Sequence, residues 1–188
     1  MDDKLFHRLL DVIEKDIVPL TARGLEEGNR IFGAAVLRRE DLSLVVAGTN
    51  HAMLSPLWHG EIYAIKLFYE LQERPSPSEC VFLATHQPCC MCASALAWSG
   101  FREVYYLFGY KHTQDSFDMP HDLKMNREIF GCDEPNPKNA YFEWRSLYAA
   151  QSGFSDPKKA EERLAALSEI YKRLAERAKI KTSGSIAV

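Results

Sequence analysis

Four side chains in two short stretches of this sequence could bind and use a metal ion. His59 and Glu61 lie two positions apart in "SPLWHGEIYAIKL", and Cys89 and Cys92 lie three apart in "ATHQPCCMCASALAW". A Cys-x-x-Cys pair at a helix start directs both sulfurs the same way, and the positive end of the helix dipole favours thiolate. A catalytic zinc takes three protein ligands and leaves one position for water. We therefore expect His59, Cys89 and Cys92 to hold one zinc ion per chain.

Glu61 is predicted to have a different role from its neighbour His59. One turn of helix places its carboxylate beside the metal, where it can take a proton from a zinc-activated water and pass it to a leaving group. The combination of H-x-E with P-C-x-x-C is a signature of zinc-dependent nucleobase deaminases. The pairing of the two motifs, each at a helix start and with one strand between them, therefore favours a catalytic zinc site over either motif alone.

Two other readings of the same residues stay open. Cys89 and Cys92 could serve a thiol redox protein, since a Cys-x-x-Cys after a strand is also typical of that class. The chain could also be a zinc-structured interaction domain that uses its long C-terminal helix. A purely structural zinc favours four protein ligands, so the presence of Glu61 argues against this second reading.

The chain contains five cysteines, and three of them fall within four positions. An odd, clustered set does not resemble the disulfide framework of a secreted domain. Cys90 is predicted to point away from the metal, and Cys80 and Cys132 are predicted to be ordinary, partly or fully buried thiols.

The composition limits the class of protein. The 188 residues are 46% hydrophobic, with a net charge of −3 and a pI of about 6.1. Proteins that bind phosphate backbones usually carry a basic excess, so nucleic acid is disfavoured as the main partner. No apolar run is long enough to span a bilayer, and the charged N-terminus does not resemble a signal peptide. We expect a cytoplasmic protein that makes no use of a membrane.

Hydrophobic periodicity and Pro/Gly punctuation divide the chain into helices and strands. The helices are expected at 3–27 with a kink or break at Pro19, at 59–73, from Cys89 to Gly100, near 121–130, and at about 157–179. The strands are expected at about 32–38, 42–48, 80–86 and 102–110. This order predicts an α/β fold, a three-layer α/β/α sandwich with a mixed central sheet of about five strands. We expect 1–188 to be a single domain with its core at about 30–135 and a C-terminal helical extension at about 140–180.

From about Phe32 to Phe130 the chain resembles the cytidine/deoxycytidylate deaminase superfamily. The motifs "WHGEIYAI" and "QPCCMCASAL" carry this resemblance. It implies a cytidine-deaminase-like fold, a homodimer, and hydrolytic deamination of a small aminated heterocycle, either a free nucleobase or a nucleoside. In that reaction zinc-bound hydroxide attacks the ring carbon that bears the amino group, Glu61 moves protons, and ammonia leaves.

The pattern is most similar to the branch that holds guanine deaminases, tRNA adenosine deaminases and fungal-type cytosine deaminases. In that branch an asparagine at the end of the hairpin hydrogen-bonds the base, and Asn50 matches it. The resemblance also implies that the backbone amides of Gly60 and Cys89 face the ring or the attacked oxygen, although Gly60 could simply ease the entry into the helix. Gln87 stands where many members have glutamate, which leaves the local hydrogen bonding open.

The resemblance to guanine deaminases is carried by Trp98 and by "YKHTQDSFD". It implies that Trp98, Asp115 and Phe117 contribute to the substrate pocket, with the alternative that Asp115 is a solvated loop residue and Phe117 a packing residue. A guanine-like substrate is therefore favoured. A tRNA-specific adenosine deaminase and a cytosine- or cytidine-type deaminase are the alternatives.

Overall fold

A five-stranded mixed sheet forms the centre of the molecule. The computed structural model describes residues 1–112 and 121–182. The strands are β1 (Gly33–Arg38), β2 (Leu44–Thr49), β3 (Cys80–His86), β4 (Glu103–Phe108) and β5 (Glu143–Ser146). Their order is β2-β1-β3-β4-β5; β1 is antiparallel to β2 and β3, whereas β3, β4 and β5 are parallel. The predicted mixed sheet of about five strands is confirmed.

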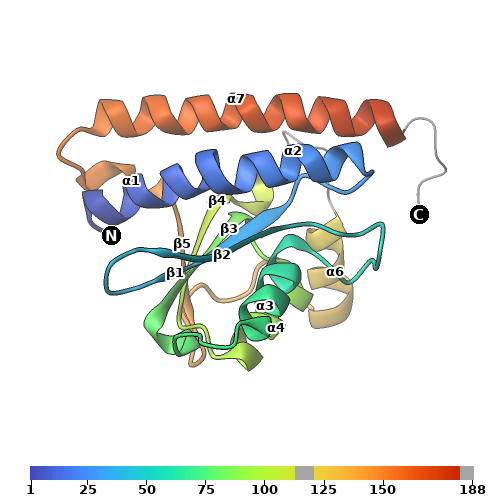
Figure 1. Cartoon of the computed structure of the whole chain (residues 1–188), viewed down its shortest axis with the longest axis horizontal. Coiled ribbons are helices and arrows are strands. Elements are labelled where there is room, and N and C mark those ends of the chain that lie inside the picture. The colour runs from blue at the N-terminus through green and yellow to red at the C-terminus, as the bar shows by residue number, and fades with distance from the viewer. Residues whose placement is uncertain (113–120, 183–188) are drawn as a thin grey trace.

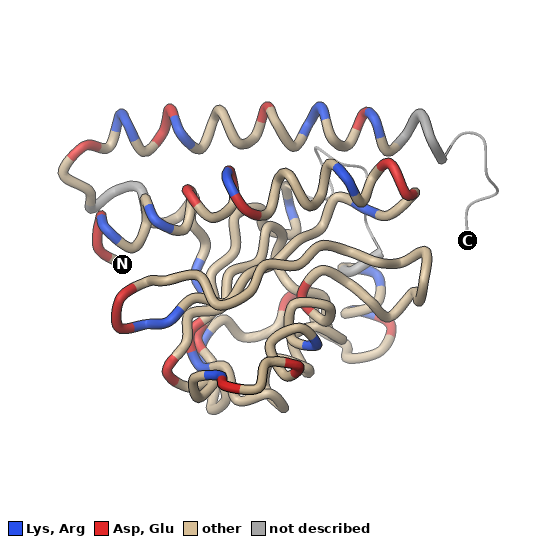
Figure 2. Tube along the Cα trace, in the orientation of Figure 1, with Lys and Arg blue, Asp and Glu red and all other residues tan. Residues whose placement is uncertain are grey.

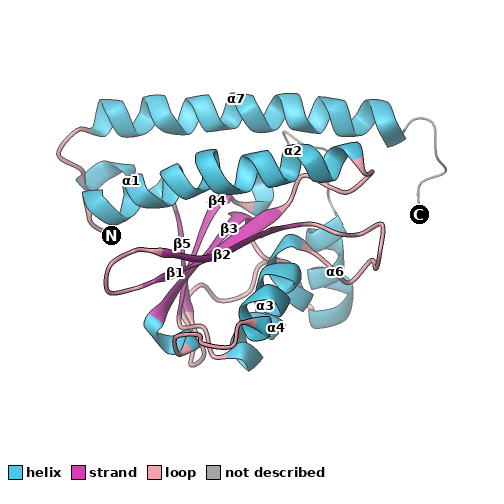
Figure 3. Cartoon of the chain, in the orientation of Figure 1, coloured by secondary structure: helices cyan, strands magenta, loops and turns pink. Residues whose placement is uncertain are grey.

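Helices cover both faces of the sheet (Figures 1 and 3). One layer holds α1 (Asp3–Val12), α2 (Val18–Glu26) and α7 (Pro157–Thr182), and the other holds α3 (Gly60–Glu70), α4 (Cys90–Ser99) and α6 (His121–Phe130). Two separate clusters of buried apolar side chains fill the spaces between the sheet and these layers. Side chains alternate between the two faces along a strand, so β3 sends Leu83 into one cluster and Phe82 into the other. The predicted α/β/α sandwich is confirmed.

Pro19 does not break the N-terminal helix. A π-helical turn at Ile13–Ile17 joins α1 to α2, and Pro19 lies in the first turn of α2. Proline has no backbone N–H, and its ring crowds the carbonyl four residues earlier, so the chain must loosen its hydrogen bonding just before it. The wider π turn supplies this adjustment. The helix continues through Pro19, so the chain has no break there.

The segment predicted as a C-terminal helical extension supplies a strand as well as a helix. β5 pairs with β4 and completes the sheet, and α7 then runs along α1 and α2 in the same direction as they do (Figure 1). Arg163 of α7 donates to the carboxylate of Asp11 at 2.7 Å and to the carbonyl of His7 at 3.1 Å. Ser155, just before α7, hydrogen-bonds Asp3. These contacts attach the last helix to the first along the same face of the sheet.

Two helices begin close together at one end of the sheet. α3 begins directly after the loop that follows β2, and α4 begins four residues after the end of β3. Ligands of open α/β sheets usually bind at the carboxyl ends of parallel strands, and β3 and β4 end here. Among the described residues, no helix combines the length and apolar character that crossing a membrane requires.

Candidate zinc centre and active site

His59, Cys89 and Cys92 come together at the starts of α3 and α4. His59 and Cys89 are the N-cap residues of the two helices, each with extended backbone dihedrals, and Cys92 lies one turn into α4. The Nδ1 atom of His59 lies 3.6 Å from the Sγ atoms of both cysteines. The three potential ligand atoms all lie within 4.8 Å of one another. Two segments far apart in the sequence thus place one nitrogen and two sulfurs around a common point.

The spacing of these atoms fits a tetrahedral zinc ion. Zinc binds histidine nitrogen at roughly 2.0–2.1 Å and thiolate sulfur at roughly 2.3 Å, and tetrahedral angles then place nitrogen and sulfur about 3.6 Å apart. The observed separations agree with this value. Both cysteines are buried and His59 is half-buried, so the cluster is more accessible from the side of His59 than from that of the cysteines. The donor set and its geometry therefore fit one zinc ion with a fourth position open.

The two thiols differ in their acidity. Hydrogen bonding from Cys92 and from His59 lowers the pKa of Cys89 to about 4, in spite of burial. The neighbouring sulfur of Cys89, together with burial, raises the pKa of Cys92 well above its usual value. Of the two thiols, Cys89 therefore ionises more readily. A dication at this point would favour the thiolate form of both residues, and its binding would release a proton.

Glu61 lies against the cluster from the first turn of α3. Its side chain is only 5% exposed, and its carboxylate lies within hydrogen-bonding reach of the Cys92 thiol, where its charge helps to raise the pKa of that group. A buried carboxylate that contacts a metal-binding cluster can hold a proton next to the open position. The structure thus brings Glu61 together with the three potential ligands.

Asn50 presents an unpaired donor beside the helix starts. Its Oδ1 atom accepts hydrogen bonds from the backbone amides of Arg30 at 3.1 Å and Ala52 at 3.0 Å, which fixes the orientation of the side-chain amide. Its Nδ2 group is fully buried and has no hydrogen-bond partner among the described residues. Burying a donor without a partner costs about 1–3 kcal/mol. Asn50 thus has a donor available for a further hydrogen bond, and its predicted contact with a base stays a prediction.

Gly60 lies in close contact with the backbone of β1. A β-carbon at position 60 would stand 2.8 Å from the α-carbon of Gly33 and 2.8 Å from the carbonyl oxygen of Phe32. Glycine is therefore required here by the approach of two backbones, a reason that the sequence did not reveal. The backbone amide of Gly60 begins α3, and its predicted contact with a substrate ring stays a prediction.

Gln87 and Tyr110 fix the turn that carries Cys89, and sequence reasoning did not assign this role to either. The Oε1 atom of Gln87 accepts from the backbone amide of Tyr110 at 3.1 Å, and the Tyr110 hydroxyl donates to the carbonyl of Pro88 at 2.6 Å. The turn is thereby attached to the end of β4. The departure from glutamate at position 87 drew attention to this residue, but nothing in the sequence named its partner.

Trp98 is not brought to this site within one chain. Its side chain is 92% exposed, and it lies six residues after Cys92, about 9 Å farther along the axis of α4. The cysteines lie at the start of α4, whereas the indole lies near its other end. The other two predicted pocket residues, Asp115 and Phe117, lie outside the described residues.

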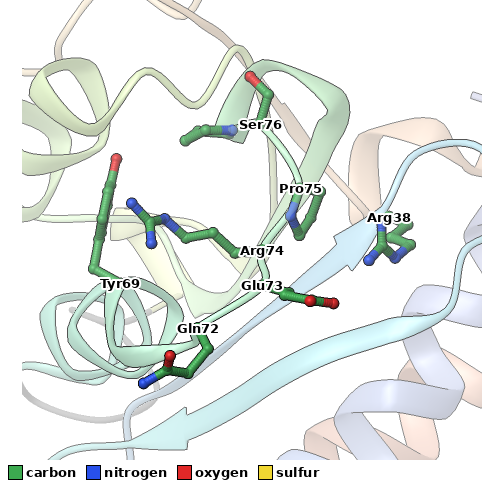
Figure 4. A pocket seen from close by; sticks show the side chains of 8 residues that line it. Arg38, Tyr69, Gln72, Glu73, Arg74, Pro75 and Ser76 are labelled. Atoms are coloured by element: carbon green, nitrogen blue, oxygen red, sulfur yellow. The ribbon is translucent and has the colours of Figure 1, made fainter.

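A surface hollow of about 650 Å³ lies at the other end of α3 (Figure 4). Arg74 directs its guanidinium over the ring of Tyr69, 4.8 Å from the ring centre, and the hollow also reaches Arg38 at the end of β1. α3 has 11 residues, so about 16 Å of helix separates this hollow from His59. The hollow does not belong to the zinc centre.

Comparison with known proteins agrees with the geometry of the centre. The family model described as "Cytidine and deoxycytidylate deaminase zinc-binding region" matches residues 15–108. This match covers half of the chain, and the chain belongs to that family. It is a zinc-dependent deaminase by class, with a His/Cys/Cys cluster that fits one zinc ion.

Two relatives share about a quarter of their residues with this chain over the aligned stretch. The chain is 26% identical over 124 residues to a probable cytosine deaminase of Schizosaccharomyces pombe, which covers 63% of this chain and 74% of that protein. It is 27% identical over 95 residues to the guanine deaminase of Bacillus subtilis, which covers 49% of this chain and 60% of that protein.

Solved structures share the fold. The guanine deaminase of Bacillus subtilis matches with a TM-score of 0.52 at 19% identity, over 86% of this chain and 92% of that one. The protein NE0047 in complex with 2,6-diaminopurine matches with a TM-score of 0.52 at 20% identity, over 92% of this chain and 82% of that one. At these identities the matches establish the cytidine-deaminase-like fold.

Proposed function

We propose that this protein hydrolytically deaminates a small aminated heterocycle, a free nucleobase or nucleoside, with a guanine-like base as the favoured substrate. The observation that carries the proposal is the convergence of His59, Cys89 and Cys92 on one point, with the buried Glu61 carboxylate against them. A structural zinc would favour four protein ligands, whereas this cluster offers three with a carboxylate against them.

The preference for a guanine-like base is supported by several likenesses. The Bacillus subtilis relative is named a guanine deaminase, and NE0047 was solved with 2,6-diaminopurine. The Schizosaccharomyces pombe relative is named a probable cytosine deaminase, which keeps a cytosine-type substrate as the alternative. Acidic and basic residues are interleaved along the part of α7 that is coloured in Figure 2, and the chain carries a net charge of −3, which argues against a tRNA substrate.

Each residue of the site would have a separate role in the reaction. His59, Cys89 and Cys92 would hold zinc, which would supply the Lewis acidity needed to activate water at neutral pH. Glu61 would accept the proton released from that water and deliver it to the departing amino group. Overall, water adds to the ring carbon, the C–N bond breaks, a carbonyl forms and ammonia leaves.

Asn50 would orient the substrate. With its Oδ1 atom occupied by two backbone amides, its Nδ2 group is the end of the side chain that remains available as a donor. A purine or pyrimidine edge that carries a carbonyl oxygen or an unprotonated ring nitrogen can accept from it. Such a contact would turn a buried, unpaired donor into a paired one, so the site gains by binding a base with an acceptor at this place.

The test is ammonia release from a panel of substrates by zinc-loaded protein. The panel holds guanine, 2,6-diaminopurine, cytosine, adenosine, a pterin and an aminotriazine, with a tRNA as a separate sample. We expect turnover of at least one free base or nucleoside, fastest with a guanine-like ring. Silence across the panel would contradict the proposal, and activity on tRNA alone would replace its substrate class. The homodimer, the cytoplasmic location and the single-domain organisation stay predictions.

A further inference from the structure

The two cysteines of the zinc centre are held in place in different ways. Cys92 is fully buried and belongs to α4, so the hydrogen bonding of the helix fixes its backbone. Cys89 is the N-cap residue, with extended backbone dihedrals, and residues 87–89 belong to no helix or strand. The position of the Cys89 sulfur therefore depends on the contacts that hold this short turn.

Three hydrogen bonds attach the turn to the chain at and just after the end of β4. The backbone amide of Gln87 donates to the carbonyl of Phe108 at 2.7 Å. The Oε1 atom of Gln87 accepts from the backbone amide of Tyr110 at 3.1 Å, and the Tyr110 hydroxyl donates to the carbonyl of Pro88 at 2.6 Å. Hydrogen bonds thus run in both directions between the turn and Tyr110.

These hydrogen bonds are shielded from water. Gln87 is 5% exposed and Tyr110 is 2% exposed, and Pro88 is buried as well. A hydrogen bond is stronger where water is excluded, and a buried polar group that loses its partner costs about 1–3 kcal/mol. The Tyr110 bond, at 2.6 Å, is short for a hydroxyl donor. Removing the hydroxyl would therefore leave the Pro88 carbonyl buried without this partner, and the turn could shift to find another.

Pro88 leaves a single backbone group at position 88 through which the turn can be held. Proline has no amide hydrogen, so its carbonyl is its only hydrogen-bonding group on the main chain. That carbonyl oxygen and the nitrogen of Cys89 belong to the same planar peptide group. The bond from Tyr110 therefore fixes the plane from which the Cys89 side chain starts, and the Cys89 sulfur is one of the three potential zinc ligands.

The alternative is that the Tyr110 hydroxyl contributes to stability alone. Tyr105 of β4 shows such an arrangement, since its hydroxyl donates to Glu103 at 2.6 Å at the opposite end of the strand from the zinc centre. Stability by itself gives no reason for the Tyr110 bond to end on the carbonyl next to Cys89. The location of this bond favours a role in alignment, and the two roles predict different results for metal binding.

We propose that Tyr110, together with Gln87, is a positioning residue for the zinc centre. Through the Pro88 carbonyl it holds the Cys89 sulfur at its distance of 3.6 Å from the His59 nitrogen, whereas the helix α4 itself holds Cys92. The inference rests on the proposed function for its catalytic consequence. Its consequence for metal binding does not depend on the substrate.

The test uses two pairs of variants. Tyr110→Phe removes the hydroxyl, and Tyr105→Phe is its matched control, because Tyr105 is also buried and also hydrogen-bonded through its hydroxyl. Gln87→Met removes the acceptor of the Tyr110 amide, whereas Gln87→Glu keeps an acceptor oxygen at the same place. Four quantities are measured for each: the melting temperature, the zinc dissociation constant by competition with a chelator, the absorption spectrum of the cobalt-substituted protein, and kcat and KM for the best substrate at saturating zinc.

We expect Tyr110→Phe and Gln87→Met to weaken zinc binding by about tenfold, as is typical when a group that orients a metal ligand is lost. The sulfur-to-cobalt charge-transfer absorption should be weaker and shifted, because Cys89 no longer meets the metal in the same geometry. The kcat should fall by about tenfold, and KM should change by less than about twofold, since these variants leave Asn50 in place. Gln87→Glu should keep the zinc affinity of wild type, and Tyr105→Phe should change only the melting temperature.

The proposal is overturned if Tyr110→Phe, like Tyr105→Phe, leaves the zinc dissociation constant and the cobalt spectrum as they are in wild type. Should Tyr110→Phe fail to fold, the two Gln87 variants decide, and equal zinc affinities and cobalt spectra of Gln87→Met and Gln87→Glu would overturn it. If wild-type protein binds zinc but deaminates nothing in the panel, the proposed function fails, whereas the zinc and cobalt measurements still test the positioning role.

Discussion

Gly60 at the start of α3 and Gly33 at the start of β1 approach so closely that a β-carbon on Gly60 would lie 2.8 Å from the α-carbon of Gly33. This contact joins the helix that carries His59 and Glu61 to β1, whose first backbone amide donates to the Thr85 hydroxyl at 3.0 Å. The atoms that a β-carbon on Gly60 would meet all belong to the backbone, so no side-chain rotation could relieve the clash.

Gly60→Ala should therefore force α3 away from β1. We expect a loss of about 1–3 kcal/mol in the free energy of unfolding, typical of overpacking, and weaker zinc binding because His59 moves with the helix. Gly24→Ala in α2 is the control, because its β-carbon would meet a methyl group of Thr49 at 3.3 Å rather than backbone. Urea unfolding and chelator competition measure both effects. Equal behaviour of the two variants would show that the close approach does not matter.

Glu61→Gln should separate catalysis from metal binding. The amide keeps the size of the side chain but cannot take a proton, so turnover should fall by at least about 100-fold while one zinc per chain remains. Glu70→Gln at the other end of α3 is the matched control, since Glu70 is exposed and pairs with Lys66 at 2.6 Å. Metal analysis and ammonia release give the two readouts. Persistent turnover in Glu61→Gln would mean that another group moves the proton.

His86 predicts a dependence of stability on pH. The unfolded chain binds a proton at this residue near pH 6.5, whereas burial keeps the folded chain from doing so until about pH 3. The unfolded state therefore binds more protons in this window, and stability falls as the pH is lowered from 6.5, by up to about 1.4 kcal/mol per pH unit.

The His86→Phe variant isolates this contribution. Phenylalanine fits among the rings of Phe32, Phe108 and Tyr171 but cannot bind a proton. Between pH 7 and pH 5.5, wild type should lose about 1 kcal/mol more of unfolding free energy than the variant. Urea unfolding at both pH values gives the difference. Equal losses of unfolding free energy in wild type and His86→Phe would indicate that His86 becomes charged without unfolding of the protein.

The ion pair between Asp11 and Arg163 should stabilise the docking of α7 on α1. Burial raises the pKa of Asp11, but the hydrogen bond and charge of Arg163 outweigh it, and the pKa is lowered overall. The stabilisation is thus present above the ordinary pKa of 3.8 and is lost as the pH falls through the lowered value. Asp11→Asn should cost about 1 kcal/mol at pH 7 and less at pH 3, by urea unfolding. An equal cost at both pH values would exclude a charge effect.

The local parts of the site could be predicted from the sequence. His59, Cys89 and Cys92 each lie within one turn of a helix start, and short-range motifs encode such positions. The His59 nitrogen lies 3.6 Å from both sulfurs because the sheet brings the two helix starts together. The order of elements in the sequence indicated such a sheet.

The long-range parts could not be predicted in this way. Gly33 and Thr85 are joined by a hydrogen bond although they lie 52 positions apart, and neither belongs to a motif. β5 is four residues long and reads "EWRS", so it lacks the apolar run that reveals a buried strand, and its charged residues pair at the sheet surface. Trp98 matched a family pattern, but its position near the end of α4 directs it to solvent.

Metal removal and restoration tests the central claim most directly. Wild-type protein is stripped with a chelator, and ammonia release from its best substrate is followed as zinc is added back. The account predicts no turnover in the stripped protein, full recovery at about one zinc per chain, and no recovery for His59→Ala or Cys92→Ser at the same zinc concentration. Undiminished turnover by fully stripped protein, or full recovery in both ligand variants, would contradict it.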